Sequence, residues 1–120
     1  MIAVIFEVTP HKAHYDEYLA IAGDLLPILE SMDGFISIER FSSLTTPGKV
    51  LSLSFWRDED AVKAWRNVAE HRAAQDEGRN RVFADYRLRV AGVIRDYGMT
   101  PREQAPDDSH AHHDMAGNKP

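Results

Sequence analysis

The sequence predicts an α+β fold in which a four-stranded antiparallel sheet carries two helices on one face. Two observations predict it. Four segments alternate apolar and polar residues, as strands do, and two longer segments place apolar residues every three or four positions, as amphipathic helices do. Their order along the chain is strand, helix, strand, strand, helix, strand, which fits two packed layers rather than a parallel sheet.

The first strand and the first helix are predicted within the first 32 residues. Met1–Thr9 alternates, with Ile2, Val4, Phe6 and Val8 on one face, and Pro10 ends the strand. A helix is expected over His14–Met32, where apolar residues recur at helical spacing. Pro27 lies inside this helix and is expected to kink it. Gly34 follows as a stop signal, because glycine readily takes a left-handed conformation.

The rest of the patterned chain supplies a hairpin, a helix and a last strand. Phe35–Ser43 and Lys49–Trp56 flank a Pro-Gly turn and are expected to pair as antiparallel strands. A second helix is expected over Asp58–Gln75, because acidic residues in its first turn suit the positive end of the helix dipole. A break or connecting loop over 76–81 and a strand over Tyr86–Tyr97 complete the series.

This order is that of the ferredoxin-like split βαβ unit. Two helices can cover only one face of the sheet, so the other face is left partly apolar by residues such as Ile5 and Val93. An exposed apolar face of that kind usually marks an interface. The sequence therefore predicts a homodimer formed through the open sheet face.

Composition excludes several classes of function. A net charge of −5 disfavours nucleic acid and anionic membranes as main partners. The absence of cysteine excludes disulfides and thiolate chemistry and fits a cytoplasmic protein. No apolar run approaches the roughly 20 residues that span a bilayer. The patterned domain is predicted to end at residue 98, and residues 99–120 form a polar tail expected to be flexible.

The most informative segment joins the third strand to the second helix. Both tryptophans, Trp56 and Trp65, lie on it nine residues apart, and His71 follows. Large aromatic side chains beside a titratable imidazole indicate a pocket for a flat, apolar ligand. On a continuous helix His71 would lie about 240° around from Trp65, on a shoulder beside the pocket. His71 could serve there as a general base, a hydrogen-bond donor or a metal ligand.

The element order, the Trp56–Trp65 spacing and the run from Ala69 to Gln75 resemble the antibiotic biosynthesis monooxygenase (ABM) family of the dimeric α+β barrel superfamily. The resemblance covers roughly residues 2–97. It implies a monooxygenase that oxygenates an aromatic or polycyclic, enolisable molecule without a cofactor. Such chemistry needs an apolar cavity, a base and a donor for the oxyanion. The residues considered for these roles are His71, Trp65, Asn67, Arg72 and Tyr86.

An IsdG-type branch of the same family degrades heme, so the resemblance also implies heme as an alternative cofactor. That branch has a helix tryptophan, an axial histidine about ten residues later and an asparagine on the first strand. Trp65 matches the tryptophan, but Gln75 occupies the histidine position and the first strand lacks asparagine. His71 could ligate heme iron in its place only if the helix were broken or shifted.

Two further interpretations stay open. The fold could be a non-catalytic dimeric barrel that merely holds a small molecule. The tail could bind a divalent metal, because clustered histidines are good ligands for such ions. The residues concerned are His110, His112 and His113.

Overall fold

The computed structural model describes residues 1–114. Its strands form one antiparallel sheet in the order β2-β3-β1-β4. Together with the helices, this confirms the predicted ferredoxin-like α+β fold. The elements are β1 (Ile2–Pro10), α1 (Tyr15–Glu30), β2 (Phe35–Ser42), β3 (Val50–Trp56), α2 (Glu59–Arg66), α3 (Ala69–Glu77), β4 (Phe83–Gly92) and α4 (Asp107–Ser109). A 3₁₀ turn η1 (Lys12–His14) and two π-helical turns, η2 (Gly78–Val82) and η3 (His110–Asp114), accompany them.

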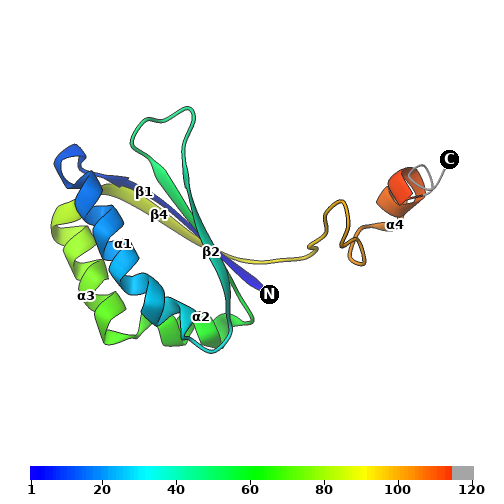
Figure 1. Ribbon diagram of the computed structural model, residues 1–120, viewed down its shortest axis with the longest axis horizontal. Coiled ribbons are helices and arrows are strands. Elements are labelled where there is room, and N and C mark those ends of the chain that lie inside the picture. The colour runs from blue at the N-terminus through cyan, green and yellow to red at the C-terminus, as the bar shows by residue number, and fades with distance from the viewer. Residues whose placement is uncertain (115–120) are drawn as a thin grey trace.

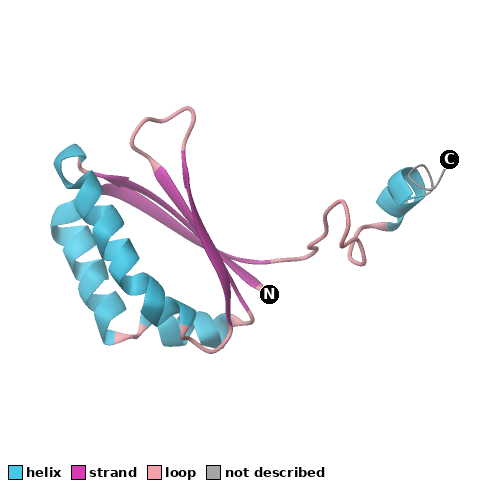
Figure 2. Cartoon of the chain, in the orientation of Figure 1, coloured by secondary structure: helices cyan, strands magenta, loops and turns pink. Residues whose placement is uncertain are grey.

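The helices α1, α2 and α3 lie on one side of the sheet, with α1 and α3 side by side (Figure 1, Figure 2). Val4 of β1 pairs with Ser54 of β3 and Val90 of β4, so these three side chains share the face that the helices cover. Ile5 pairs with Leu53 on the opposite, open face. The predicted division of β1 into two faces is therefore confirmed.

The core has two buried clusters under the helices. One contains Val8, Tyr18, Val50 and Val82, and the other contains Leu29, Trp56, Ala61 and Val62. Trp56 is only 1% exposed. Burying a large side chain of this kind stabilises a fold by roughly 1.5–3 kcal/mol. The two clusters hold opposite ends of the helices against the sheet and leave a space between them.

The expected continuous helix over Asp58–Gln75 is wrong. It breaks at Asn67 and Val68, where the backbone of Val68 is extended. The side chain of Asn67 donates to the carbonyl of Lys63 at 2.9 Å, and side chains of this type compete with helical hydrogen bonding. The break separates Trp65 on α2 from His71 on α3.

Of the two alternatives expected over 76–81, a break or a connecting loop, the loop is wrong, because α3 ends at Glu77 and a π-helical turn follows it. Helix α3 continues through η2 directly into β4, which begins at Phe83 rather than Tyr86. Gly78 makes this tight connection possible, because a Cβ there would lie 2.4 Å from the ring of Phe83. Strand β4 ends at Gly92 because its partner β1 begins opposite it, at Ile2.

Helix α1 runs through Pro27 as one element, and the expected kink stays a prediction. Gly34 takes a φ of +84°, as its position after the helix predicts. After β4 the chain leaves the body of the molecule and ends its described part in α4 and η3 (Figure 1). The domain boundary at residue 98 and the flexibility of the tail stay predictions. None of the helices within residues 1–114 is long and apolar enough to cross a membrane.

Candidate functional site

A cavity of about 380 Å³ lies between the sheet and the helices. This volume is at the lower end of the range of about 300–1,000 Å³ that small-molecule sites occupy. Most of its wall is apolar, and β1, α1 and β4 supply much of this apolar surface. The apolar lining includes Val4, Phe6, Ile21, Leu25, Leu29, Phe83, Leu88 and Val90. The cavity therefore suits a small, largely apolar ligand.

One end of the cavity is closed by a stack of aromatic rings. The rings of Trp56 and Trp65 lie 6.5 Å apart, and the imidazole of His71 lies 4.4 Å from Trp65 at an interplanar angle of 16°. All three residues line the cavity. The expected 240° separation of His71 from Trp65 is wrong, because the break at Asn67 and Val68 folds α3 back and brings the two rings together.

The hydrogen bonding of His71 determines which nitrogen can act. Its Nδ1 lies 3.1 Å from the backbone carbonyl of Trp65. A carbonyl only accepts hydrogen bonds, so Nδ1 carries the proton and Nε2 keeps its lone pair. Burial lowers the pKa of His71 below its usual 6.5; the bond to the Trp65 carbonyl opposes this shift, and the charge of Arg72 adds to it. His71 is therefore a neutral imidazole at pH 7 with a basic nitrogen available.

The sheet supplies a polar floor to the cavity. Arg40 of β2 pairs in register with Ser52 of β3, and both line the cavity together with Ser54. Ser54 Oγ accepts a hydrogen bond of 3.0 Å from Trp56 Nε1. The Nε atom of Arg40 is buried and has no hydrogen-bond partner within residues 1–114.

Sequence reasoning missed Arg40, Ser52 and Ser54. One signal could have found Arg40. It lies two residues after Ile38, on the same side of β2, so it is a charged residue where the alternation places a buried one.

Most of the other candidate residues lie around the mouth. Arg72, Gln75 and Tyr86 line the cavity, and Tyr86 is 41% exposed at its edge. Asn67 is not part of the lining. Its Oδ1 accepts a hydrogen bond of 2.8 Å from Arg72, whose other arm donates to Gln75 Oε1 at 3.2 Å. Asn67 thus positions Arg72 and does not itself face a ligand.

The tail histidines lie outside the cavity. His110, His112 and His113 belong to η3, where the rings of His112 and His113 meet edge to face at 4.6 Å. Across the described part of the chain, no three histidine or acidic side chains are grouped closely enough to hold a metal.

Comparison with known families fits this arrangement. The model of the antibiotic biosynthesis monooxygenase family matches residues 1–77. The chain belongs to this family. The match includes β1 to β3 and the helix segments that carry Trp65 and His71, so it covers the aromatic end of the cavity and its polar floor.

Two relatives are similar to this chain in sequence over most of its length. A jasmonate monooxygenase from Pyricularia oryzae is 52% identical over 93 residues, which are 78% of this chain and 43% of that protein. The chain thus spans less than half the length of this relative. An uncharacterized protein, YqjZ of Bacillus subtilis, is 33% identical over 94 residues, 78% of this chain and 79% of that protein.

The solved structures show the fold alone, because their sequence identities are low. A structure named as an antibiotic biosynthesis monooxygenase from Deinococcus radiodurans gives a TM-score of 0.74 at 13% identity, covering 82% of this chain and 98% of its own. Rv0793 from Mycobacterium tuberculosis gives 0.73 at 14% identity, with coverages of 81% and 98%.

Proposed function

We propose that this ABM-family monooxygenase acts without a cofactor on a small, enolisable molecule bound in the cavity between sheet and helices. One observation carries the proposal: His71 presents a basic Nε2 in an apolar cavity, with its tautomer fixed by the Trp65 carbonyl. A neutral imidazole in such surroundings is suited to removing a proton from a carbon acid or a phenol. Family membership supports the reaction class.

The reaction needs no external reductant. His71 takes a proton from a methylene group beside a carbonyl, and the resulting enolate passes electrons to dioxygen. One oxygen atom becomes a new carbonyl at the methylene carbon and the other leaves as water, so that R₂CH₂ and O₂ give R₂C=O and H₂O. The apolar walls place the enolate in surroundings of low polarity. Arg72 and Tyr86, at the mouth, are the donors proposed to stabilise the negative charge that develops on oxygen.

The substrate class is tested with an oxygen electrode. The panel contains anthrones, quinols, cyclic diketones and jasmonic acid, a cyclic ketone with acidic C–H bonds beside its carbonyl. Jasmonic acid is included because of the name of the Pyricularia relative. The proposal expects oxygen uptake with at least one class and one labelled atom in the product under ¹⁸O₂. No uptake across the panel would favour the non-catalytic ligand-binding barrel.

Heme binding or degradation is the second candidate. One observation favours it: the helix break brings His71 against Trp65 and leaves Nε2 with a lone pair, which an iron ligand requires. Two observations oppose it: Gln75 lines the cavity where the heme-degrading branch has its axial histidine, and the cavity is small. Heme titration with visible spectroscopy separates the candidates. A Soret shift that His71→Ala abolishes would support heme, and an unchanged Soret band would eliminate it.

We also propose that the chain forms a homodimer through the open sheet face. Ile5 and Leu53 pair across that face, and Leu51 and Phe55 continue its apolar surface. Glu7 lies among them, and its carboxylate is paired with Arg89 at 2.9 Å and with Lys49 at 3.4 Å. Such a surface is suited to a second copy. Sedimentation equilibrium should give twice the chain mass; monomer at every concentration would refute the dimer.

A further inference from the structure

One nitrogen of the Arg40 side chain, on the floor of the cavity, lacks a hydrogen-bond partner within the described chain. The side chain comes from an inward position of β2, beside Ser52, and the nitrogen without a partner is its buried Nε. Buried polar groups are nearly always paired, and an exception needs an explanation. Arg40 also lines the cavity, so a ligand there lies beside a guanidinium that is not fully paired.

The charges around the cavity point to the sign of that ligand. Four arginines line it against a single carboxylate, Asp76, although the whole chain has a net charge of −5. Within residues 1–114, ion pairs to carboxylates engage Arg57, Arg81 and Arg89 but none of these four. The lining arginines are Arg40, Arg66, Arg72 and Arg79. A cavity with this imbalance concentrates anions at its mouth.

We infer that the cavity selects amphipathic monocarboxylates, whose carboxylate binds Arg40 at the floor while the apolar body lies along the walls. The planar fork of a guanidinium matches the two oxygens of a carboxylate, and Ser52 adds a hydroxyl beside it. The apolar walls require the rest of the ligand to be apolar. This inference deepens the proposed function, because it names the substrate class of the same cavity.

The inference gives Arg40 a different role from His71. Arg40 lies on the sheet and His71 on α3, so the carboxylate anchors one end of the ligand on the floor while the imbalance of charge at the mouth favours its entry. Arg40 is thus a specificity-determining residue, and a ligand without the carboxylate loses its anchor but keeps the apolar contacts.

Matched pairs of acid and ester test the inference by binding alone. The probes are jasmonic acid and 1-naphthaleneacetic acid, each with its methyl ester, titrated by isothermal calorimetry. Both tryptophans line the cavity, so quenching of their fluorescence by the jasmonates gives a second signal. The wild type should bind each acid about tenfold or more tightly than its ester, the size expected for a charge-assisted pair. Arg40→Met should remove that preference and leave ester affinity unchanged within about threefold.

Two further variants complete the experiment. Arg40→Lys keeps the positive charge but lacks the planar guanidinium, so it should retain part of the preference for acid over ester. It also replaces Arg40→Met in the test if that variant does not fold. Arg95→Met, an exposed position beyond β4, is the matched control and should behave as wild type. Equal affinity for acid and ester, no binding of either acid, or an undiminished preference in both Arg40 variants would overturn the inference.

The experiments distinguish a failure of this inference from a failure of the proposed function. Selective binding of acids without any oxygen uptake would refute monooxygenation and leave the inference standing. Oxygen uptake at equal kcat/KM on an acid and its ester would refute the inference and leave monooxygenation standing.

Discussion

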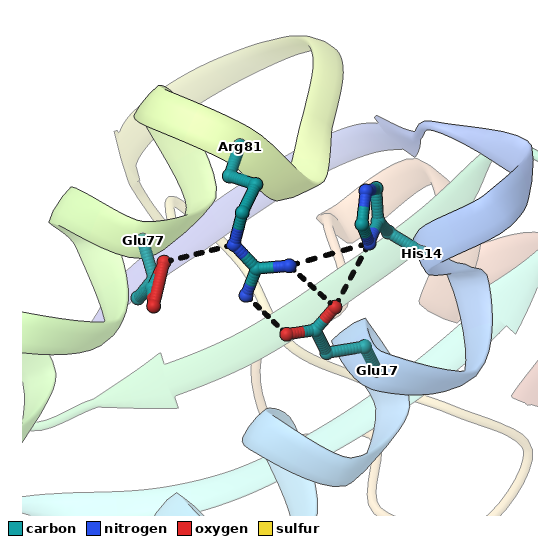
Figure 3. Close-up of polar contacts among 4 residues, drawn as sticks. All are labelled: His14, Glu17, Glu77 and Arg81. Atoms are coloured by element: carbon teal, nitrogen blue, oxygen red, sulfur yellow. Dashed lines mark hydrogen bonds and ion pairs between the residues drawn. The ribbon is translucent and has the colours of Figure 1, made fainter.

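Two groups of residues in this molecule each contain an arginine and a histidine, but the two arginines differ in their hydrogen-bond partners. The surface cluster consists of His14, Glu17, Glu77 and Arg81 (Figure 3). In it Arg81 donates through both terminal nitrogens to Glu17 and through Nε to Glu77 at 3.3 Å. In the cavity, the Nε of Arg40 has no acceptor in the described chain. Arg81 ties elements together through its carboxylate partners, whereas the guanidinium of Arg40 is the group that we propose binds a ligand.

The titratable groups differ in the same way. Hydrogen bonds and charge from Arg81, with a further bond from His14, lower the pKa of Glu17 to about 2. Burial, with a smaller contribution from the charge of Arg72, lowers the pKa of His71. The first shift keeps a charge at the surface and the second removes one from the cavity. The cluster therefore serves the fold, while the cavity keeps a neutral base.

The largest expected effect comes from exchanging each histidine for asparagine. His71→Asn can keep the donor to the Trp65 carbonyl but has no basic nitrogen, so kcat/KM for oxygen uptake should fall by about 10²–10⁴. His14→Asn is the matched control in the surface cluster and should stay within about twofold. Full activity in His71→Asn would remove His71 from the mechanism and end the contrast between the two histidines.

Gly78 joins the two regions, because η2 carries Arg81 toward the surface and Gly78 itself lines the cavity. In Gly78→Ala the new Cβ would lie 2.4 Å from the Phe83 ring. Overpacking of this kind should lower the free energy of unfolding by about 1–3 kcal/mol and weaken ligand binding. Gly23→Ala, at an exposed helical position with no atom within 4 Å of its Cβ, should instead be neutral or stabilising. Urea unfolding measures both variants, and equal stabilities would contradict the prediction.

The sequence predicted the strands and the division of each into two faces, because alternation records which side chains lie on the same side of a strand. Val4 and Phe6 face the helices as expected, and the segment from Trp56 to His71 does form one wall of the cavity. The helix break could not be predicted, because neither Asn67 nor Val68 is a strong breaker. The contacts that accompany the break are the hydrogen bond from the Asn67 side chain and the packing of His71 on Trp65. Both depend on the folded structure and cannot be inferred from helix propensity.

The polar floor of the cavity could not be predicted from the sequence for a different reason. Alternation puts Ser52 and Ser54 on one face of β3 and Leu53 and Phe55 on the other, but it does not say which face the helices cover. The usual expectation would bury the leucine face. The pairing register with β1 shows the opposite arrangement. It places the serines beside Val4 and Phe6, on the face that lines the cavity.

The next largest expected effect is the pH dependence of activity, which depends on His71 in the cavity and not on the surface cluster. In the proposed mechanism His71 acts as a neutral base, and its pKa lies below 6.5, so kcat/KM should be constant above about pH 6.5. It should fall about tenfold per pH unit only below the lowered pKa. Oxygen uptake across a pH series measures this, with activities corrected for the fraction folded. An inflection above pH 6.5 would show that burial does not set the protonation of the base.

The smallest effect is the acid sensitivity of the surface cluster. Glu17 has a folded pKa of about 2 against an ordinary value of 4.5, so its contribution to stability is complete above pH 4.5 and is lost as pH falls toward 2. The difference in Tm between wild type and Glu17→Gln should therefore be constant near neutral pH and shrink as the solution is acidified through this window. Its size should be small, because His14, Glu77 and Arg81 are partly or fully exposed and solvent screens the cluster. A difference that persists unchanged at pH 2 would mean that Glu17 acts through packing, and the contrast between a charge-paired surface and an unpaired cavity would then rest on Arg40 alone.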